Sequence, residues 1–300
     1  MDIPIRVVAS YTTLPDRYEV LYKSICSLQE QTHKLDAIYV CVPKKATRLN
    51  KEYPPLPENI TNACSIINID TDYGPLTKIY GALVSESDPN TVIISCDDDV
   101  IFAPNHVDIL LKHHKNHPNC AICGTGALIG RGLLFISIVS SVNPFRGWNG
   151  FTGFKVPPDG RKVDLIFGVA GVLYVRKFFP THDKLNEEIL QYSLRDNAVF
   201  CNDDVLISGY LSKQKIERRV FIDIPTIHHN DYDVRESALS SNIMKMIMRL
   251  NTSIQKVKEY GFFPYMEEVP LDETVAGRVF ILIVFLIVII ILCVYLYKGL

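Results

Sequence analysis

The chain has 300 residues, 48% of them apolar, and a formal net charge of −2. This length fits one large domain or two small ones. A charge so close to neutral excludes a general nucleic-acid-binding surface, which needs an excess of positive charge, so we expect no nucleic-acid partner.

Short apolar stretches alternate with helical patterns through the first hundred residues. We predict strands at residues 6–10, 37–42, 64–69 and 91–96, with helical patterns after the first and third strands. Such alternation predicts βαβ units with right-handed crossovers. The expected fold class is therefore α/β, with a mixed, mostly parallel sheet flanked by helices.

The middle of the chain carries glycines and aromatic residues in unusual density. Residues 143–160 combine Gly, Pro and aromatics without a helical or strand period, which favours an acceptor-binding or lid loop. Gly168 and Gly171 then interrupt an apolar stretch that ends in a strand at Val175. Glycine at such places indicates either a bulge or a close approach of the backbone to a ligand.

The C-terminal part begins with a helix that Asn202 or Asp203 can cap. A strand is predicted at residues 219–224, and an amphipathic helix at residues 243–257. That helix either packs on its own domain or lies on a membrane surface.

The last apolar segment, residues 279–297, is uncharged and flanked by Arg278 and Lys298. As a helix it would extend about 28 Å, which is close to the hydrocarbon thickness of a bilayer, so we predict a transmembrane helix. The N-terminus lacks the pattern of a secretory signal. The expected organisation is a catalytic domain at residues 1–262 facing the cytosol, a linker at 263–278 and a single-pass membrane anchor at 279–297.

Three consecutive acids, Asp97, Asp98 and Asp99, directly follow the predicted strand at residues 91–96. Ligands in open α/β sheets bind beyond the carboxyl ends of the strands. Adjacent carboxylates repel one another, and a divalent cation such as Mn²⁺ or Mg²⁺ relieves that repulsion while leaving positions for substrate phosphates. A solvated acidic turn is the plain alternative.

The order of motifs resembles a family. The segment Asp-Tyr-Gly-Pro-Leu-Thr-Lys at residues 72–78 is followed by the triple acid, by Gly-Val-Ala-Gly at 168–171, by Asn-Asp-Asp-Val at 202–205 and by a late His pair. Together, over about residues 5 to 230, they resemble nucleotide-sugar-dependent glycosyltransferases of the GT-A (Rossmann-like) fold, of the family 2 type.

The resemblance implies a role for each matching position. Asp97 would lie near the ribose or base and share the metal ion with Asp99, Asp98 would assist, and His228 or His229 would complete the shell. The nucleotide sugar, expected to be a UDP-sugar, would also contact Thr12, Arg17, Asp72 and Lys78.

The general base would be Asp204, with Asp203 beside it. The Asn-Asp-Asp sequence departs from the commoner Glu-Asp pair, so which Asp is the base and whether the displacement inverts or retains stay open. Both acids can also be simple helix-cap residues. Lys78 and Arg17 can be surface charges, and His228 and His229 polar residues at a strand end.

The expected function is metal-dependent transfer of a sugar from a nucleotide sugar to a hydroxyl of a glycan, protein or lipid near the membrane. The alternatives are a nucleotidyltransferase, which also uses acidic metal ligands, and a non-catalytic, membrane-tethered protein that binds nucleotide sugars. The chain lacks the Gly-rich basic N-terminal loop that nucleotidyltransferases usually need, which makes the nucleotidyltransferase the weaker interpretation.

Overall fold

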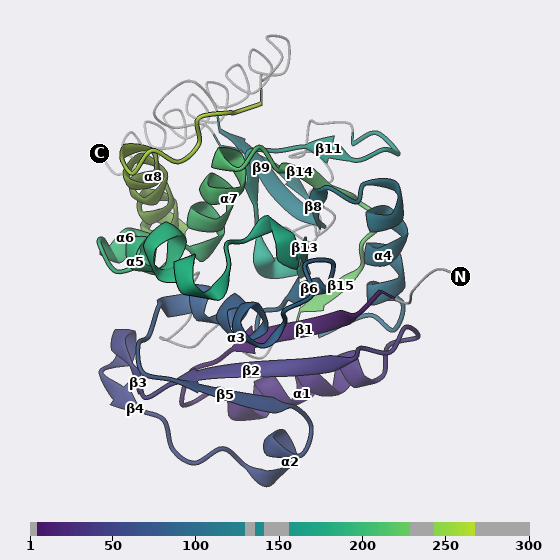
Figure 1. The fold of residues 1–300 in the computed structure, drawn as a ribbon, viewed down its shortest axis with the longest axis vertical. Helices are drawn as coiled ribbons and strands as arrows, with labels where there is room; N and C mark the ends of the chain where they lie inside the picture. The colour runs from purple at the N-terminus through teal and green to yellow at the C-terminus, as the bar shows by residue number, and fades with distance from the viewer. Residues whose placement is uncertain (1–4, 130–135, 141–155, 229–242, 268–300) are drawn as a thin grey trace, which may run out of the picture.

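A computed structural model describes residues 5–129, 136–140, 156–228 and 243–267. The first half of the chain builds alternating strands and helices, as Figure 1 shows. Its elements are β1 (Val7–Thr12), α1 (Tyr18–Gln29), β2 (Ala37–Pro43), β3 (Lys45–Ala46), β4 (Lys51–Glu52), α2 (Glu58–Thr61), β5 (Ser65–Ile69), α3 (Thr77–Ser85), β6 (Val92–Ser95), β7 (Val100–Phe102), α4 (His106–Asn116), β8 (Cys120–Cys123) and β9 (Thr125–Ile129).

The second half adds short strands, then helices. Its elements are β10 (Ile136–Ser140), β11 (Arg161–Lys162), β12 (Leu165–Ile166), β13 (Val172–Val175), α5 (Gln191–Ser193), α6 (Asn197–Phe200), α7 (Asp203–Lys213), β14 (Glu217–Val220), β15 (Thr226–His228) and α8 (Ile243–Glu259).

One eight-stranded sheet runs through the molecule in the order β11-β14-β8-β13-β6-β1-β2-β5. The pairs β5–β2, β2–β1, β1–β6 and β8–β14 are parallel. Strand β13 is antiparallel to both of its neighbours, β6 and β8, and β11 is antiparallel to β14. The prediction of an α/β fold with a mixed, mostly parallel sheet is confirmed.

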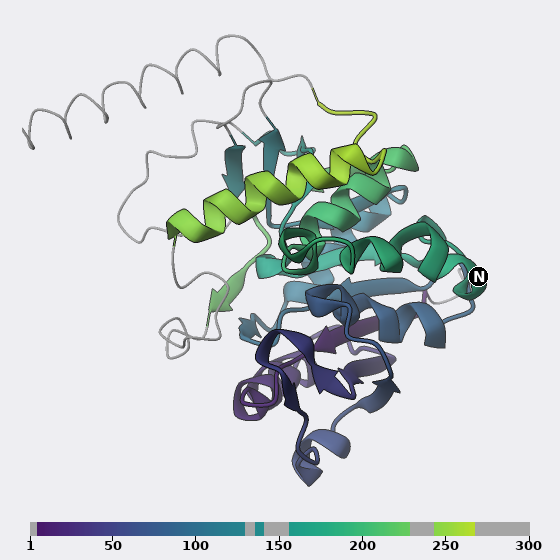
Figure 2. The same cartoon turned by 90° about the vertical axis from the view of Figure 1, so that its left-hand side faces the viewer.

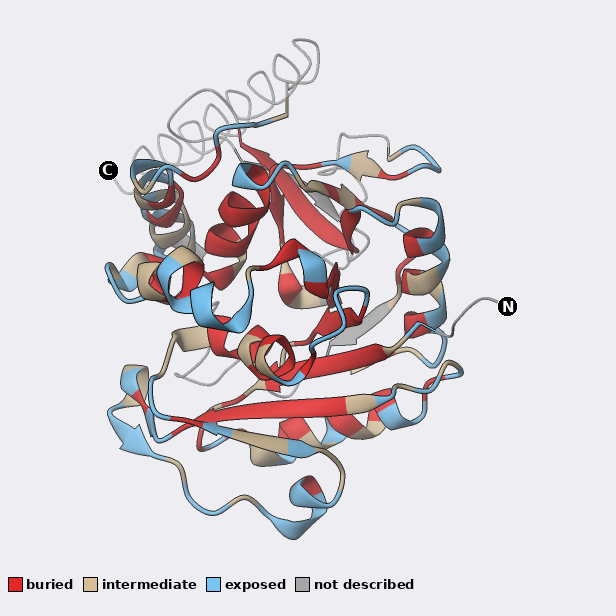
Figure 3. Cartoon of the chain, in the orientation of Figure 1, coloured by how far each residue is buried: buried red, intermediate tan, exposed pale blue. Residues whose placement is uncertain are grey.

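The sheet is buried on both faces, which explains the continuous apolar strands of the sequence. Alternate residues of β1 point to opposite cores: Val8 joins one, and Val7 and Ala9 the other. Helices α3 and α7 cover the first face and α1 and α4 the second. Figure 3 shows the central strands as the most buried part of the chain.

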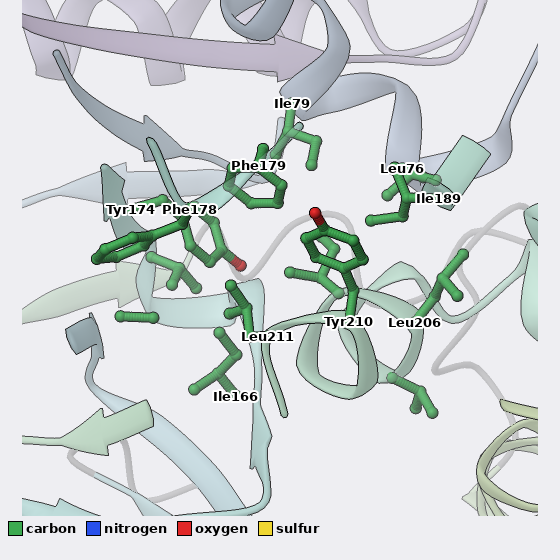
Figure 4. Packing of buried hydrophobic residues seen from close by; sticks show 14 of the residues in the cluster. Leu76, Ile79, Ile166, Tyr174, Phe178, Phe179, Ile189, Leu206, Tyr210 and Leu211 are labelled. Carbon is green, nitrogen blue, oxygen red and sulfur yellow. The ribbon is translucent and has the colours of Figure 1, made fainter. Parts of the chain in front are cut away.

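Helix α7 is buried almost all round, because it packs between the sheet and α8. Its side chains Leu206, Tyr210 and Leu211 join a cluster that includes Leu76 and Ile79 near the start of α3 (Figure 4). Figure 2 shows α8 lying along the outside of α7, with its C-terminal half against the domain. The first turns of α3 and α7 are thereby held side by side, and both carry predicted site residues.

Two expectations about the fold need correction. The predicted fold included a transmembrane helix, but none of the helices in the described parts of the chain is long and apolar enough to cross a membrane. The predicted span at residues 279–297 lies outside those parts, as does most of the predicted loop at 143–160. Residues 44–62, whose polar, Pro-rich sequence without an apolar period predicts a loop, contain the hairpin β3–β4 and helix α2. The proline and polar residues of this segment obscure the apolar periodicity from which such short elements could be predicted.

Candidate active site

The candidate site lies where the strand order changes direction. From β1 the chain adds β2 and β5 on one side, then returns to place β6 on the other side of β1. The loops that follow the carboxyl ends of β1 and β6 therefore lie where the strand order reverses, which is the usual ligand-binding place in such sheets. The loop after β6 contains the triple acid, and the loop after β1 runs from Thr13 to Arg17.

Asp98 joins these two loops. The hydroxyl of Thr13 donates to one Asp98 oxygen at 2.6 Å, and the guanidinium of Arg17 donates to the other at 2.7 Å. Asp98 is only 6% exposed, and burial raises the pKa of its carboxyl although Arg17 and Thr13 act in the opposite direction. Both oxygens of Asp98 are thus bonded within the protein, so this acid organises the loops.

Asp97 and Asp99 are the more accessible members of the triple acid. Their side chains are 33% and 38% exposed. Asp97 accepts a hydrogen bond from Lys78, and Asp99 lies 3.4 Å from Arg17. Burial, followed by the charges of Asp98 and Asp97, raises the pKa of Asp99 to about 7. These two carboxylates each keep one oxygen without a bonded partner among the described residues.

Lys78 connects the triple acid to helix α7. Its ammonium group lies 2.7 Å from an Asp97 oxygen and 2.9 Å from an Asp203 oxygen, although its residue is only 3% exposed. Burial lowers the pKa of Lys78, but Asp203, Asp97 and Asp204 together outweigh that effect and hold it well above its ordinary value. Lys78 is therefore a buried, charged bridge between two acidic groups, where the resemblance placed a contact to a diphosphate.

Asp204 is held by backbone. The N–H of Gly168 donates to both of its oxygens, each at 3.1 Å. Burial and the charge of neighbouring Asp203 raise the pKa of Asp204 to about 8, against the opposing effect of Lys78. Asp203 instead faces Lys78 and is 6% exposed. The two adjacent acids thus have different environments, which separates their chemical roles.

Gly168 lies directly against the charged side chains of the site. A Cβ atom at this position would lie 2.8 Å from the Lys78 nitrogen and 3.3 Å from an Asp97 oxygen. A side chain at this position would force the Lys78 ammonium group to shift, so glycine lets Lys78 and Asp97 meet beside Asp204. The sequence predicted that glycine here marks either a bulge or a close approach of the backbone to a ligand. In the structure the backbone comes close to the charged side chains of the site itself.

His228 lies beside the triple acid by backbone pairing. Strand β15 is antiparallel to β7 and sets His228 opposite Val100, the residue after Asp99. The orientation of the His228 side chain is outside the described structure, and His229 lies outside the described residues altogether.

Thr12 and Asp72, two of the predicted nucleotide contacts, make hydrogen bonds within the protein. The Thr12 hydroxyl donates to the carbonyl of Cys41 at 2.9 Å, which ties β1 to β2. Asp72 accepts from the backbone N–H groups of Thr47 and Gly74, at 2.7 and 2.8 Å. Thr13 was missed although it follows Thr12, because sequence alone does not show where a strand ends and its loop turns inward.

The charge balance of the site favours a bound cation. The acids at positions 97, 98, 99, 203 and 204 lie around the cations Lys78 and Arg17. Burial first, and then repulsion from neighbouring acids, raises the pKa values of Asp99 and Asp204. In the described part of the chain, no three His, Cys, Asp or Glu side chains are already arranged around one metal position. The free oxygens of Asp97 and Asp99 fit two ligands of an ion that keeps water and substrate in its other positions.

Comparison with known proteins adds no relative. No family model matches the sequence, and a search of curated proteins finds no match.

Proposed function

We propose that this protein is a metal-dependent glycosyltransferase that moves a sugar from a nucleotide sugar, of the UDP-sugar type, to an acceptor hydroxyl on a glycan, protein or lipid. The observation that carries the proposal is that two acidic groups from different elements meet around Lys78. Asp97 and Asp99 follow the central strand β6, Asp203 and Asp204 lie in the first turn of helix α7, and Lys78 bridges Asp97 and Asp203. The resemblance of the sequence motifs to GT-A glycosyltransferases supports the same conclusion.

The donor side of the site is the loop after β6. Asp97 and Asp99 would hold Mn²⁺ or Mg²⁺, which when bound neutralises charge on the leaving nucleoside diphosphate. Arg17 and Thr13 keep this loop in place by fixing Asp98 at 2.7 and 2.6 Å. The position of β15 opposite β7 makes His228 a further candidate ligand.

The acceptor side is the start of α7. Asp204 is the general base that accepts the proton of the attacking hydroxyl, and the Gly168 N–H fixes the direction of its carboxylate. A base is most effective when its pKa lies near the working pH, and the pKa of Asp204 is about 8. Asp203 forms an ion pair with Lys78, so its role is to hold Lys78 in place, and it does not accept the proton. A separate base opposite the leaving group suits an inverting displacement.

The test is turnover of a panel of nucleotide sugars by the full chain with Mn²⁺. Asp99→Ala should abolish metal-dependent release of nucleoside diphosphate while the folded circular dichroism spectrum persists. Asp70→Ala is the matched control, because its side chain is 83% exposed on the surface and pairs only with Lys44 among the described residues. Full sugar transfer by Asp99→Ala would refute the proposal, and release of pyrophosphate instead would identify a nucleotidyltransferase.

A further inference from the structure

We propose that the Lys78 ammonium occupies the position of a second cation and limits this site to one divalent ion, held on the Asp99 side. The inference rests on the metal binding in the proposed function and concerns how many ions the acids accept. In this proposal Lys78 positions the acids of the site and does not contact the donor phosphates.

The first argument is geometric. Two carboxylates from different elements, Asp97 and Asp203, converge on the Lys78 nitrogen at 2.7 and 2.9 Å. Gly168 lies against the same nitrogen, since a Cβ there would lie 2.8 Å from it. The lysine side chain is 4% exposed, so it is almost entirely shielded from solvent. The ammonium is thus enclosed as a bound metal ion would be.

The second argument concerns Asp203. Its oxygen facing Lys78 is buried and receives no aligned hydrogen bond in the described structure, so the ion pair alone compensates it. A buried carboxylate that lacks hydrogen bonds needs a cation beside it. If Lys78 lost its charge, this oxygen and that of Asp97 would attract another cation to the same position.

The third argument is chemical. In two-metal sites, ions about 3.5–4 Å apart stabilise both the attacking and the leaving oxygen of a phosphoryl group. Lys78 donates to one oxygen of Asp97, and the other oxygen has no bonded partner among the described residues, so Asp97 can lie between the ammonium group and one divalent ion. Lysine is a compact fixed charge that offers no open coordination position. One exchangeable ion is sufficient for a leaving diphosphate, which is the requirement of sugar transfer.

The experiment is a titration of the full chain with Mn²⁺, followed by electron paramagnetic resonance of the free ion and by calorimetry. The wild type should bind one Mn²⁺ per chain at this site. Lys78→Met, which keeps the side-chain length without the charge, should bind a second ion or bind Mn²⁺ at least tenfold more tightly. Lys78→Arg should behave as the wild type, and so should the control Lys44→Met, whose side chain is 76% exposed.

Two further variants keep the test decisive if Lys78→Met folds poorly. The single variant Asp203→Asn should bind Mn²⁺ with an affinity within about twofold of the wild type, because Asp203 pairs with Lys78 and does not bind the ion. Adding Asp203→Asn to Lys78→Met should remove the second ion. Two ions bound by the wild type, or a tenfold loss of affinity in Asp203→Asn, would overturn the inference.

The outcomes also separate this inference from the proposed function. One Mn²⁺ bound by the wild type without turnover of any nucleotide sugar would contradict the glycosyltransferase and leave the role of Lys78 supported. Turnover with unchanged Mn²⁺ binding in Lys78→Met would support the glycosyltransferase and contradict the role of Lys78.

Discussion

The backbone N–H of Gly168 donates to both carboxylate oxygens of Asp204, at 3.1 Å each. This contact joins the turn before β13 to the first turn of α7, and it orients the candidate base without using a second side chain. A Cβ at the same position would crowd Lys78, whose nitrogen would lie 2.8 Å from it.

We therefore predict that Gly168→Ala lowers sugar-transfer activity at least tenfold. The added methyl would displace the Lys78 ammonium, which its Cβ would approach to 2.8 Å, and turn Asp204 away from its N–H donor. Crowding of this kind typically destabilises by about 1–3 kcal/mol. Steady-state kinetics and urea denaturation measure the two effects separately.

Gly81→Ala is the matched control for that prediction. It lies within α3, where an added Cβ meets its nearest neighbours at an ordinary 3.5 Å. Alanine is favoured over glycine inside a helix by about 1 kcal/mol, so stability should be unchanged or higher and activity retained. Equal losses in the two variants would show that the effect at Gly168 is general crowding.

The pH dependence of turnover should report the ionisation of Asp204. Its pKa is raised from 3.8 to about 8, so the rate should increase with pH up to that region, as the carboxylate becomes available to accept a proton. Asp203→Asn removes a neighbouring negative charge that raises this pKa, so its profile should move to lower pH. The measurement is kcat against pH at saturating Mn²⁺. A profile that Asp203→Asn leaves in place would contradict the assignment of Asp204 as the base.

The contribution of Asp204 and Asp99 to stability should decrease as the pH rises from about 4 to 8, whereas buried His106, whose pKa is lowered to about 4, contributes in the opposite direction below about pH 6.5. In that window the folded protein retains protons on Asp204 and Asp99 that the unfolded chain has released, because both pKa values are raised in the folded state. Mn²⁺ should raise the melting temperature more at pH 8 than at pH 5, since deprotonated acids bind it better. Differential scanning fluorimetry with and without the ion tests both trends, and Asp99→Asn should weaken the ion's effect.

Arg17→Met should destabilise the protein by about 3–5 kcal/mol, because it leaves the buried Asp98 carboxylate without its cation. The double variant Arg17→Met with Asp98→Asn should recover at least half of this loss. Urea denaturation monitored by circular dichroism measures the change. An exposed ion pair provides the contrast: Lys44→Met breaks the pair with Asp70 and should cost less than about 1 kcal/mol.

Much of this architecture could be predicted from local patterns. The continuous apolar strands predicted a sheet flanked by helices on both faces. Asp97 to Asp99 were also predicted correctly to follow a strand, which is β6. Strand β13 was predicted to end at Val175, as observed, but its antiparallel direction between β6 and β8 was not predictable. The direction of a strand depends on the long-range path of the chain, which leaves no mark on its own residues.

The sequence by itself determined the α/β class and the two acidic groups, because strand periodicity and clustered charge are properties of neighbouring residues. Tertiary structure alone decided that Asp98 turns inward to Thr13 and Arg17, that Lys78 bridges Asp97 and Asp203, and that Gly168 holds Asp204. Three consecutive aspartates are equivalent in a sequence. They become different only when separate loops surround each carboxylate with its own donors and its own degree of burial.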